Sequence, residues 1–157
     1  PERHPKMKTL RSFTAIAITC LGTSALAADG LVAVRSPHDA KATMDRLEAQ
    51  VKKRGLTVFL RLDHAAGAAK IGKSLRPTEL LVFGNPQGGT PFMECAQSAG
   101  IDLPLKALVW EDSSSQGWLG SNDPAFLAKR HEVAQCPVAG NLQKALAGIA
   151  EATVARD

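Results

Sequence analysis

The sequence has no tyrosine, and aromatic residues make up only 4% of its 157 residues. A surface that stacks the bases of single-stranded nucleic acid needs several aromatic side chains, so this composition argues against one. The sequence has no C-x-x-C pair and no compactly spaced Cys and His residues of the kind that bind zinc. It therefore indicates no metal site and does not identify a cofactor. With 45% hydrophobic and 22% charged residues, and no repeat or linker, the chain has the composition of one globular domain.

The first residues after Met7 have the three parts of a secretory leader. Lys8 and Arg11 give a basic start, an apolar run follows over residues 13–21, and Ala25-Leu26-Ala27 forms an A-x-A cleavage site. We therefore expect a cleaved signal peptide over residues 7–27, with cleavage after Ala27 and a periplasmic or secreted protein. The apolar run is too short to span a bilayer comfortably, so we expect no stable membrane insertion after cleavage.

Removing this leader changes the charge balance. The other residues carry 15 Lys or Arg against 14 Asp or Glu, so the mature chain is close to +1 instead of +4. The densest basic stretch, Lys52-Lys53-Arg54, stands where a helix ends, and cations there complement the helix dipole. No basic block remains that could neutralise a row of phosphates, and nucleic acid is not expected as a partner.

Two cysteines remain after the leader, Cys95 and Cys136. An even count in an oxidising compartment predicts a disulfide between them. Two separate buried thiols are the alternative, because the sequence does not show whether the two Cα atoms come within bonding reach.

The rest of the chain, residues 28–157, predicts a single α+β domain. Strands are expected at 31–35, 56–62, 79–83, 103–111 and 118–121, the last two as a hairpin. Ser36 is expected to cap a helix that Gly55 ends, and the last helix is expected over 141–154. Short connections between the middle strands favour a two-layer arrangement, with a mostly antiparallel sheet and the long helices on one face.

The segment Gly84-Asn85-Pro86-Gln87-Gly88-Gly89-Thr90-Pro91 suggests a phosphate-binding loop. Gly84 and Gly89 have the P-loop separation, but Thr90 stands in the place of the lysine and Pro91 in the place of the magnesium-binding hydroxyl. Nucleotide binding is therefore not expected. We expect a turn from strand to helix, with Thr90 as the helix cap and Pro91 at the first helical position.

Histidine and carboxylate side chains are the remaining chemical candidates. His64 follows Asp63 at a strand exit, where a general base with an orienting carboxylate could stand. Asp102 is a second carboxylate candidate for His64, or else a turn former. His131 follows Lys129-Arg130 at a helix end, which suits the helix dipole without any function.

A series of short motifs gives a family resemblance over about residues 30–155. The motifs are LDH at 62–64, LRPTELLVFGNP at 75–86, GTP at 89–91, GIDLPLK at 100–106, VWED at 109–112, and NDP at 122–124 leading to Arg130-His131. In this order they resemble the DUF302 domain family. The resemblance implies a TBP-like α+β fold with a β-α-β4-α core, and no established reaction.

The family's recurring polar residues correspond to the following set of candidate ligand-binding positions: His64, Asn85, Thr90, Asp102 and Asn122. Many members have an aromatic residue where this chain has Ser121, which implies a different ligand preference. The two cysteines are not part of the family pattern.

We therefore expect an exported domain that binds a small ligand or acts as a sensor-like module, and not an enzyme. One alternative is a small hydrolase or isomerase with His64 as general base. Another is a protein-interaction module, and a homodimer is a form to be tested. The catalytic residues, the ligand and any cofactor remain unassigned by the sequence.

Overall fold

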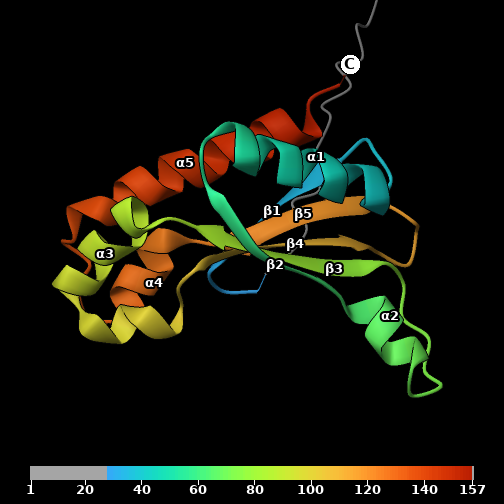
Figure 1. The fold of residues 1–157 in the computed structure, drawn as a ribbon, viewed down its shortest axis with the longest axis horizontal. Helices are drawn as coiled ribbons and strands as arrows, with labels where there is room; N and C mark the ends of the chain where they lie inside the picture. Colours follow the sequence, from blue (N-terminus) through green and yellow to red (C-terminus); the bar gives the residue numbers. More distant parts are fainter. Residues whose placement is uncertain (1–27, 157) are drawn as a thin grey trace, which may run out of the picture.

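The computed structural model describes residues 28–156, and the predicted leader at 7–27 lies outside them. The described chain forms one antiparallel sheet in the order β1-β5-β4-β3-β2, with helices around it (Figure 1). The elements in chain order are β1 Leu31–Ser36, α1 Ala40–Lys53, β2 Thr57–Asp63, α2 His64–Ala69, β3 Thr78–Gly84, α3 Pro86–Cys95, η1 Gln97–Ile101 (a 3-10 helix), β4 Leu105–Glu111, β5 Gly117–Asn122, α4 Pro124–Arg130 and α5 Pro137–Val154.

The two long helices, α1 and α5, lie side by side on one face of the sheet (Figure 1). Their apolar stripes pack on the inward residues of the central strands, including Leu81 and Phe83 of β3 and Val109 of β4, all fully buried. The expected two-layer α+β fold with helices on one face is confirmed. The short helices α2, α3 and α4 are additions between the β-α-β4-α elements.

The start of α1 differs from the expected one. Asp39, and not Ser36, caps the helix, because its carboxylate accepts a hydrogen bond from the Ala42 N–H at 2.7 Å. Ser36 instead ends β1, and its buried hydroxyl lies 2.7 Å from the hydroxyl of Thr43. Gly55, at φ +72°, ends the helix as expected.

Arg61 of the edge strand β2 joins the sheet to α1. Its guanidinium contacts Asp45 at 2.7 Å and Glu48 at 3.1 Å on α1, and Glu79 of β3 at 2.5 Å. Glu79 and then the two helix carboxylates raise the pKa of Arg61. The pKa of Asp45 is lowered by hydrogen bonds from Lys41 and Arg61. One cation thus holds three carboxylates at the open edge of the sheet.

A second, smaller core lies at the end of the sheet where α3, η1, α4 and the start of α5 meet. Phe92 of α3 is fully buried there, against Ala99 of η1, Leu127 of α4 and Leu142 of α5. Leu105, at the start of β4, packs against both cores. Because the two cores meet only at a few such side chains, the space between them can remain open.

Among residues 28–156, no long helix covers the face of the sheet opposite α1 and α5 (Figure 1). Side chains alternate along each strand, so Leu80, Leu108 and their cross-strand partner Leu62 point to this open sheet face. Leu62 is 40% exposed and Leu60 is 48% exposed. An apolar strip therefore remains accessible along β2.

The β4–β5 hairpin adds the two tryptophans to the open sheet face. Trp110 and Trp118 pair across the strands with ring centroids 6.2 Å apart, and the Arg35 guanidinium lies 5.7 Å from the Trp118 ring centre. Trp118 Nε1 donates to Asp112 Oδ2 at 2.9 Å. This bond, with the Gln116 and Ser114 N–H groups, lowers the pKa of the Asp112 carboxyl.

Candidate functional site

A cavity of about 700 Å³ opens where the two cores meet. We call it the α3–α5 cavity, and it is lined by residues 84–90 and Met93 around α3, by residues 100 and 103–105, by Leu56 and Phe59, and by the inner side of α5 from 138 to 149. Its volume lies within the range of about 300–1,000 Å³ that is typical of small-molecule sites. Of the described residues, none with a charged side chain lines it.

The first turn of α3 forms the polar wall of this cavity. Asn85, and not Thr90, caps the helix: its Oδ1 accepts from the Gly88 N–H at 2.8 Å, and Pro86 takes the first helical position. Thr90 and Pro91 lie inside the helix. The helix therefore begins at Pro86, five residues before the predicted start at Pro91. The Gly-rich segment is the start of α3 and not a phosphate loop.

This helix start leaves hydrogen-bonding groups at the cavity. Pro91 has no N–H, so the Gln87 carbonyl lacks its usual donor four residues on. The Asn85 amide uses its oxygen in the cap, and within residues 28–156 its Nδ2 makes no hydrogen bond. Thr90 and Asn141 add a hydroxyl and a second amide to the lining. These groups are all neutral, and they include both donors and acceptors.

Two glycines let the walls approach. A Cβ on Gly88 would lie 3.3 Å from Asn85 Oδ1 and 3.5 Å from a methyl group of Leu142, and one on Gly89 would touch Leu103 at 3.6 Å. Gly88 thus lies close against the capping side chain of Asn85, whereas a Cβ at Gly89 would make an ordinary van der Waals contact with Leu103.

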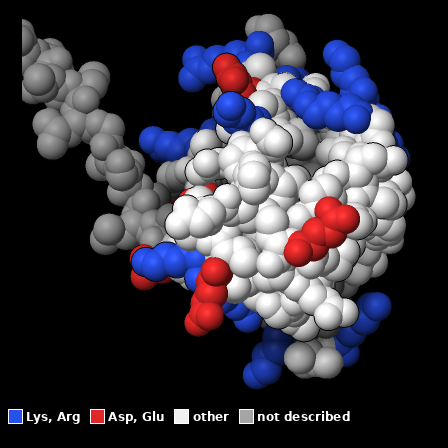
Figure 2. Space-filling model, turned by 90° about the vertical axis from the view of Figure 1, so that its left-hand side faces the viewer, with Lys and Arg blue, Asp and Glu red and all other residues white. Residues whose placement is uncertain are grey.

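The surroundings of the cavity are poor in charge. From Gly84 to Leu105, only Glu94 and Asp102 carry a charge. Figure 2 views the molecule from the end that bears α3 and α4, and most of this surface is uncharged, with charged side chains mainly around its rim. Met93, Ile101 and Phe59 are among the exposed large apolar residues of the protein. The site is thus suited to an uncharged ligand.

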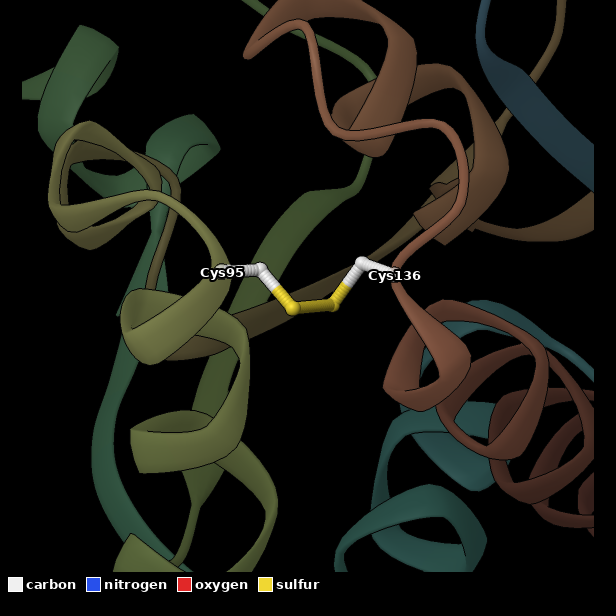
Figure 3. The surroundings of a disulfide bond; sticks show 2 residues. All are labelled: Cys95 and Cys136. Carbon is white, nitrogen blue, oxygen red and sulfur yellow. A yellow bond between two sulfur atoms is a disulfide. The ribbon is translucent and has the colours of Figure 1, made fainter.

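A disulfide joins the two helices that wall the cavity (Figure 3). Cys95 is the last residue of α3 and Cys136 is the N-cap of α5, with their Cα atoms 6.1 Å apart. This is the pair that the cysteine count suggested. It fixes the end of one wall against the start of the other.

Asp102 lies away from the cavity and contacts the end of α4. Arg130 donates to Asp102 Oδ1 at 2.9 Å, and His131 Nε2 lies 2.6 Å from Asp102 Oδ2. The other ring nitrogen of His131, Nδ1, lies 2.9 Å from the hydroxyl of Ser98 in η1. From the sequence, His131 was expected only to complement the helix dipole at the end of a helix. No motif in the sequence pointed to Ser98 as a functional residue.

His64 and Asn122 stand apart from these groups. His64 is exposed at the start of α2, at the opposite end of the sheet from α3 (Figure 1). Its neighbour Asp63 caps α2 by accepting from the Ala66 N–H at 2.8 Å, and no carboxylate contacts the His64 ring within the described part of the chain. Asn122 is the exposed last residue of β5 and lines a second cavity of about 490 Å³ beneath α5.

The five predicted positions therefore fall into four places, and only Asn85 and Thr90 share one. The polar residues of the cavity lining that the sequence did not identify are Gln87 and Asn141. The charge-poor stretch at 84–105 was a visible signal for Gln87, whereas Asn141 lies outside that stretch and carried none. Across residues 28–156 there is no group of three or more His, Cys, Asp or Glu side chains placed to hold a metal ion.

Comparison with known proteins now identifies the family. The model of DUF302, "Domain of unknown function DUF302", matches residues 32–150. The chain belongs to the DUF302 family. The structure of an uncharacterized conserved DUF302 protein from Bacillus stearothermophilus has the same fold, with a TM-score of 0.73, 22% identity, and coverage of 80% of this chain and 99% of that one.

Curated relatives of this DUF302 chain carry a channel name. "Fluoride-specific ion channel FluC 1" of Brucella suis biovar 1 (strain 1330) is 51% identical over 104 residues, 66% of this chain. "Fluoride-specific ion channel FluC 2" of Brucella melitensis biotype 1 (strain ATCC 23456 / CCUG 17765 / NCTC 10094 / 16M) is equally similar over the same share. The chain spans only 41% and 38% of these two relatives. In the part of the DUF302 chain that the structure describes, no helix combines the length and apolarity needed to cross a membrane.

Proposed function

We propose that this DUF302 domain is an exported, sensor-like module that binds a small, uncharged and mostly apolar molecule in the α3–α5 cavity. The observation that carries this proposal is the cavity of about 700 Å³, lined by apolar side chains and by neutral groups of Asn85, Gln87, Thr90 and Asn141. A few convergent polar groups in an apolar cleft are typical of sites that orient a small ligand.

The position of the cavity supports a sensor-like role. It lies between the two cores, so a bound molecule would contact residues of both, such as Leu142 of the smaller core and Ile149 of the larger one. A ligand that binds only the folded state stabilises it by about 2.7 kcal/mol at a concentration one hundred times its Kd. We expect ligand binding to tighten the α3–α4 end of the domain.

The test uses N-phenyl-1-naphthylamine, an uncharged aromatic probe whose fluorescence rises in apolar surroundings. The mature protein should bind it, and Ala145→Trp, which fills the cavity from α5, should weaken binding at least tenfold. Lys144→Trp is the matched control, because Lys144 is an exposed neighbour outside the cavity lining. Equal binding by both variants, or no binding by the wild type, would rule out the α3–α5 cavity as the site.

Export is the second part of the proposal, and the A-x-A sequence before Ala28 supports it. Expression of the chain from Met7 should give periplasmic protein whose first residue is Ala28. N-terminal mass analysis of cell fractions measures this directly. Full-length protein confined to the cytosol would exclude export.

Fluoride should be tested as a ligand as well, because the curated relatives are named as fluoride-specific channels. This chain matches less than half of their length, so fluoride is tested as a ligand of this domain alone. Sodium fluoride is tested by thermal shift against sodium chloride at equal ionic strength. A rise with fluoride alone would favour this anion over the uncharged ligand.

A protein-interaction module is the second candidate, and the open sheet face favours it. Leu60 and Leu62 leave apolar surface accessible on the edge strand β2, on the same face of the sheet as the tryptophan pair of β4 and β5. A homodimer through this face should dissociate on Leu62→Glu, whereas Ile101→Glu, at the opposite end of the protein, should not affect it. Sedimentation velocity distinguishes the two, and a wild-type monomer at all concentrations would exclude the homodimer.

The hydrolase or isomerase alternative with His64 receives no support from the geometry, because His64 is exposed and lies apart from Asp102.

A further inference from the structure

Ser98, His131 and Asp102 form a connected chain of side chains on the α4 side of the domain, separate from the lining of the α3–α5 cavity. The Ser98 hydroxyl lies 2.9 Å from His131 Nδ1, and His131 Nε2 lies 2.6 Å from Asp102 Oδ2. We call these three residues the Ser98–His131–Asp102 relay. They come from η1, the residue after α4, and the residue after η1, and so converge only in the fold.

The partners define the proton positions. An ionised carboxylate only accepts hydrogen bonds, so His131 Nε2 donates its proton to Asp102. In the neutral ring the other nitrogen, Nδ1, then has a free lone pair and accepts from the Ser98 hydroxyl. The histidine is thus oriented by a carboxylate and directed at a hydroxyl, as in a serine nucleophile and its base, with the two ring nitrogens exchanged: Nδ1 faces the serine and Nε2 faces the carboxylate.

Within the relay the histidine and the carboxylate are largely buried and the serine is exposed, as nucleophilic attack on a substrate from solvent requires. The side chains of His131 and Asp102 are only 7% and 11% exposed, so the ring is held in place and shielded from water. Ser98 itself is exposed and can meet a substrate. Arg130 also contacts Asp102, at 2.9 Å, but its side chain is 54% exposed and it touches neither Ser98 nor the His131 ring, so it stands outside the relay.

We propose that Ser98 is a nucleophile that accepts acyl groups from small activated esters, with His131 as its general base and Asp102 as the positioning residue. The Ser98 oxygen attacks the ester carbonyl carbon while its proton passes to His131 Nδ1. The bond from the carbonyl carbon to the leaving oxygen then breaks, the leaving group departs as an alkoxide or phenoxide, and the acyl group stays on Ser98. The Nδ1 proton returns to the solvent or the leaving group.

A water molecule completes the cycle. It attacks the acyl-Ser98 carbonyl, gives a proton to His131 Nδ1, and the carbonyl bond to the Ser98 oxygen breaks. The released carboxylic acid leaves the protein, and Ser98 regains its proton from His131. Asp102 remains ionised throughout and stabilises the positively charged ring in both half-reactions.

The experiment follows p-nitrophenyl acetate hydrolysis by the mature protein. General-base assistance contributes typically 10²–10⁴-fold, so Ser98→Ala should lose at least tenfold of the protein-dependent rate. Ser113→Ala is the matched control, since Ser113 is an exposed serine in the β4–β5 turn. Mass spectrometry of the protein quenched during turnover should find one acetyl group on the peptide that contains Ser98.

Two further variants separate a relay from a polar contact that only holds η1 against α4. Asp102→Asn should lower the rate as Ser98→Ala does, whereas Arg130→Gln removes a structural partner of Asp102 and should keep at least the wild-type rate. An unchanged rate in Ser98→Ala, acetyl groups found only elsewhere, or equal losses in Asp102→Asn and Arg130→Gln would each overturn the proposal. Ser98 is exposed, so its alanine variant should keep the wild-type unfolding midpoint and decides the result alone. Binding of the naphthylamine probe by Ser98→Ala keeps this test separate from that of the cavity.

Discussion

Reduction of the Cys95–Cys136 disulfide should lower the free energy of unfolding by about 4 kcal/mol. The two cysteines are 41 residues apart in sequence. A cross-link that closes a loop of that size removes about 13 cal/mol/K of entropy from the unfolded chain, which corresponds to about 4 kcal/mol at 25 °C. The same bond ties α3 to α5, so its loss should also loosen the wall of the α3–α5 cavity.

Urea unfolding of one protein in its oxidised and reduced forms gives the cleanest measurement, because both forms have the same side chains. With a slope of about 2 kcal/mol/M, the midpoint should fall by about 2 M on reduction. The Cys95→Ser, Cys136→Ala double variant should resemble the reduced protein. A midpoint shift below about 0.5 M would refute the reasoning, because the cross-link would then restrict neither the unfolded chain nor the helices.

Four further outcomes follow from single contacts. Gly117→Ala should destabilise the fold by about 1–3 kcal/mol, because its Cβ would lie 2.7 Å from a backbone carbonyl oxygen. Gly140→Ala, in open space on α5, should instead stabilise the fold by about 0.5–1 kcal/mol. Thermal unfolding measures both changes. Arg61→Ala should cost about 1–3 kcal/mol in urea unfolding because three carboxylates lose their shared cation, while Lys41→Ala, the control at an exposed cation, should leave the unfolding midpoint close to that of the wild type. Asp112→Asn should destabilise at neutral pH only: the pKa of Asp112 is lowered in the folded state, so its stabilisation is present above the ordinary aspartate pKa and is lost as pH falls through the folded value. Unfolding curves of this variant and the wild type should therefore converge in acid, and a difference that persists there would contradict the assignment.

The sheet and its helices could be predicted from the sequence because local patterns fix them. The apolar stripe through Met44, Leu47 and Val51 gave α1, and the turn between Glu111 and Trp118 gave the hairpin. The first residues of the helices were harder to predict. Asn85-Pro86 and Thr90-Pro91 are the same signal, a capping side chain followed by proline, and sequence alone does not say which of them begins the helix.

The site was less predictable because it depends on contacts between distant segments. His131 lies 29 residues from Asp102 and 33 from Ser98, and no spacing rule joins them. His64 and Asp63 are adjacent in the chain, yet Asp63 caps α2 and leaves the ring without an acidic partner among the described residues. The adjacent residues Asp63 and His64 suggested His64 as the histidine with an acidic partner, whereas in the described part of the fold His131 is the one that contacts a carboxylate, that of Asp102.

The tryptophan pair has a consequence for spectroscopy. The chain contains two tryptophans and no tyrosine, so Trp110 and Trp118 account for nearly all of its near-ultraviolet absorbance and emission. Both lie on one hairpin, on the side of the sheet away from α1 and α5. Intrinsic fluorescence therefore reports on that side alone: a partner that covers it should shift the emission to shorter wavelengths, while a molecule entering the α3–α5 cavity should leave the spectrum unchanged.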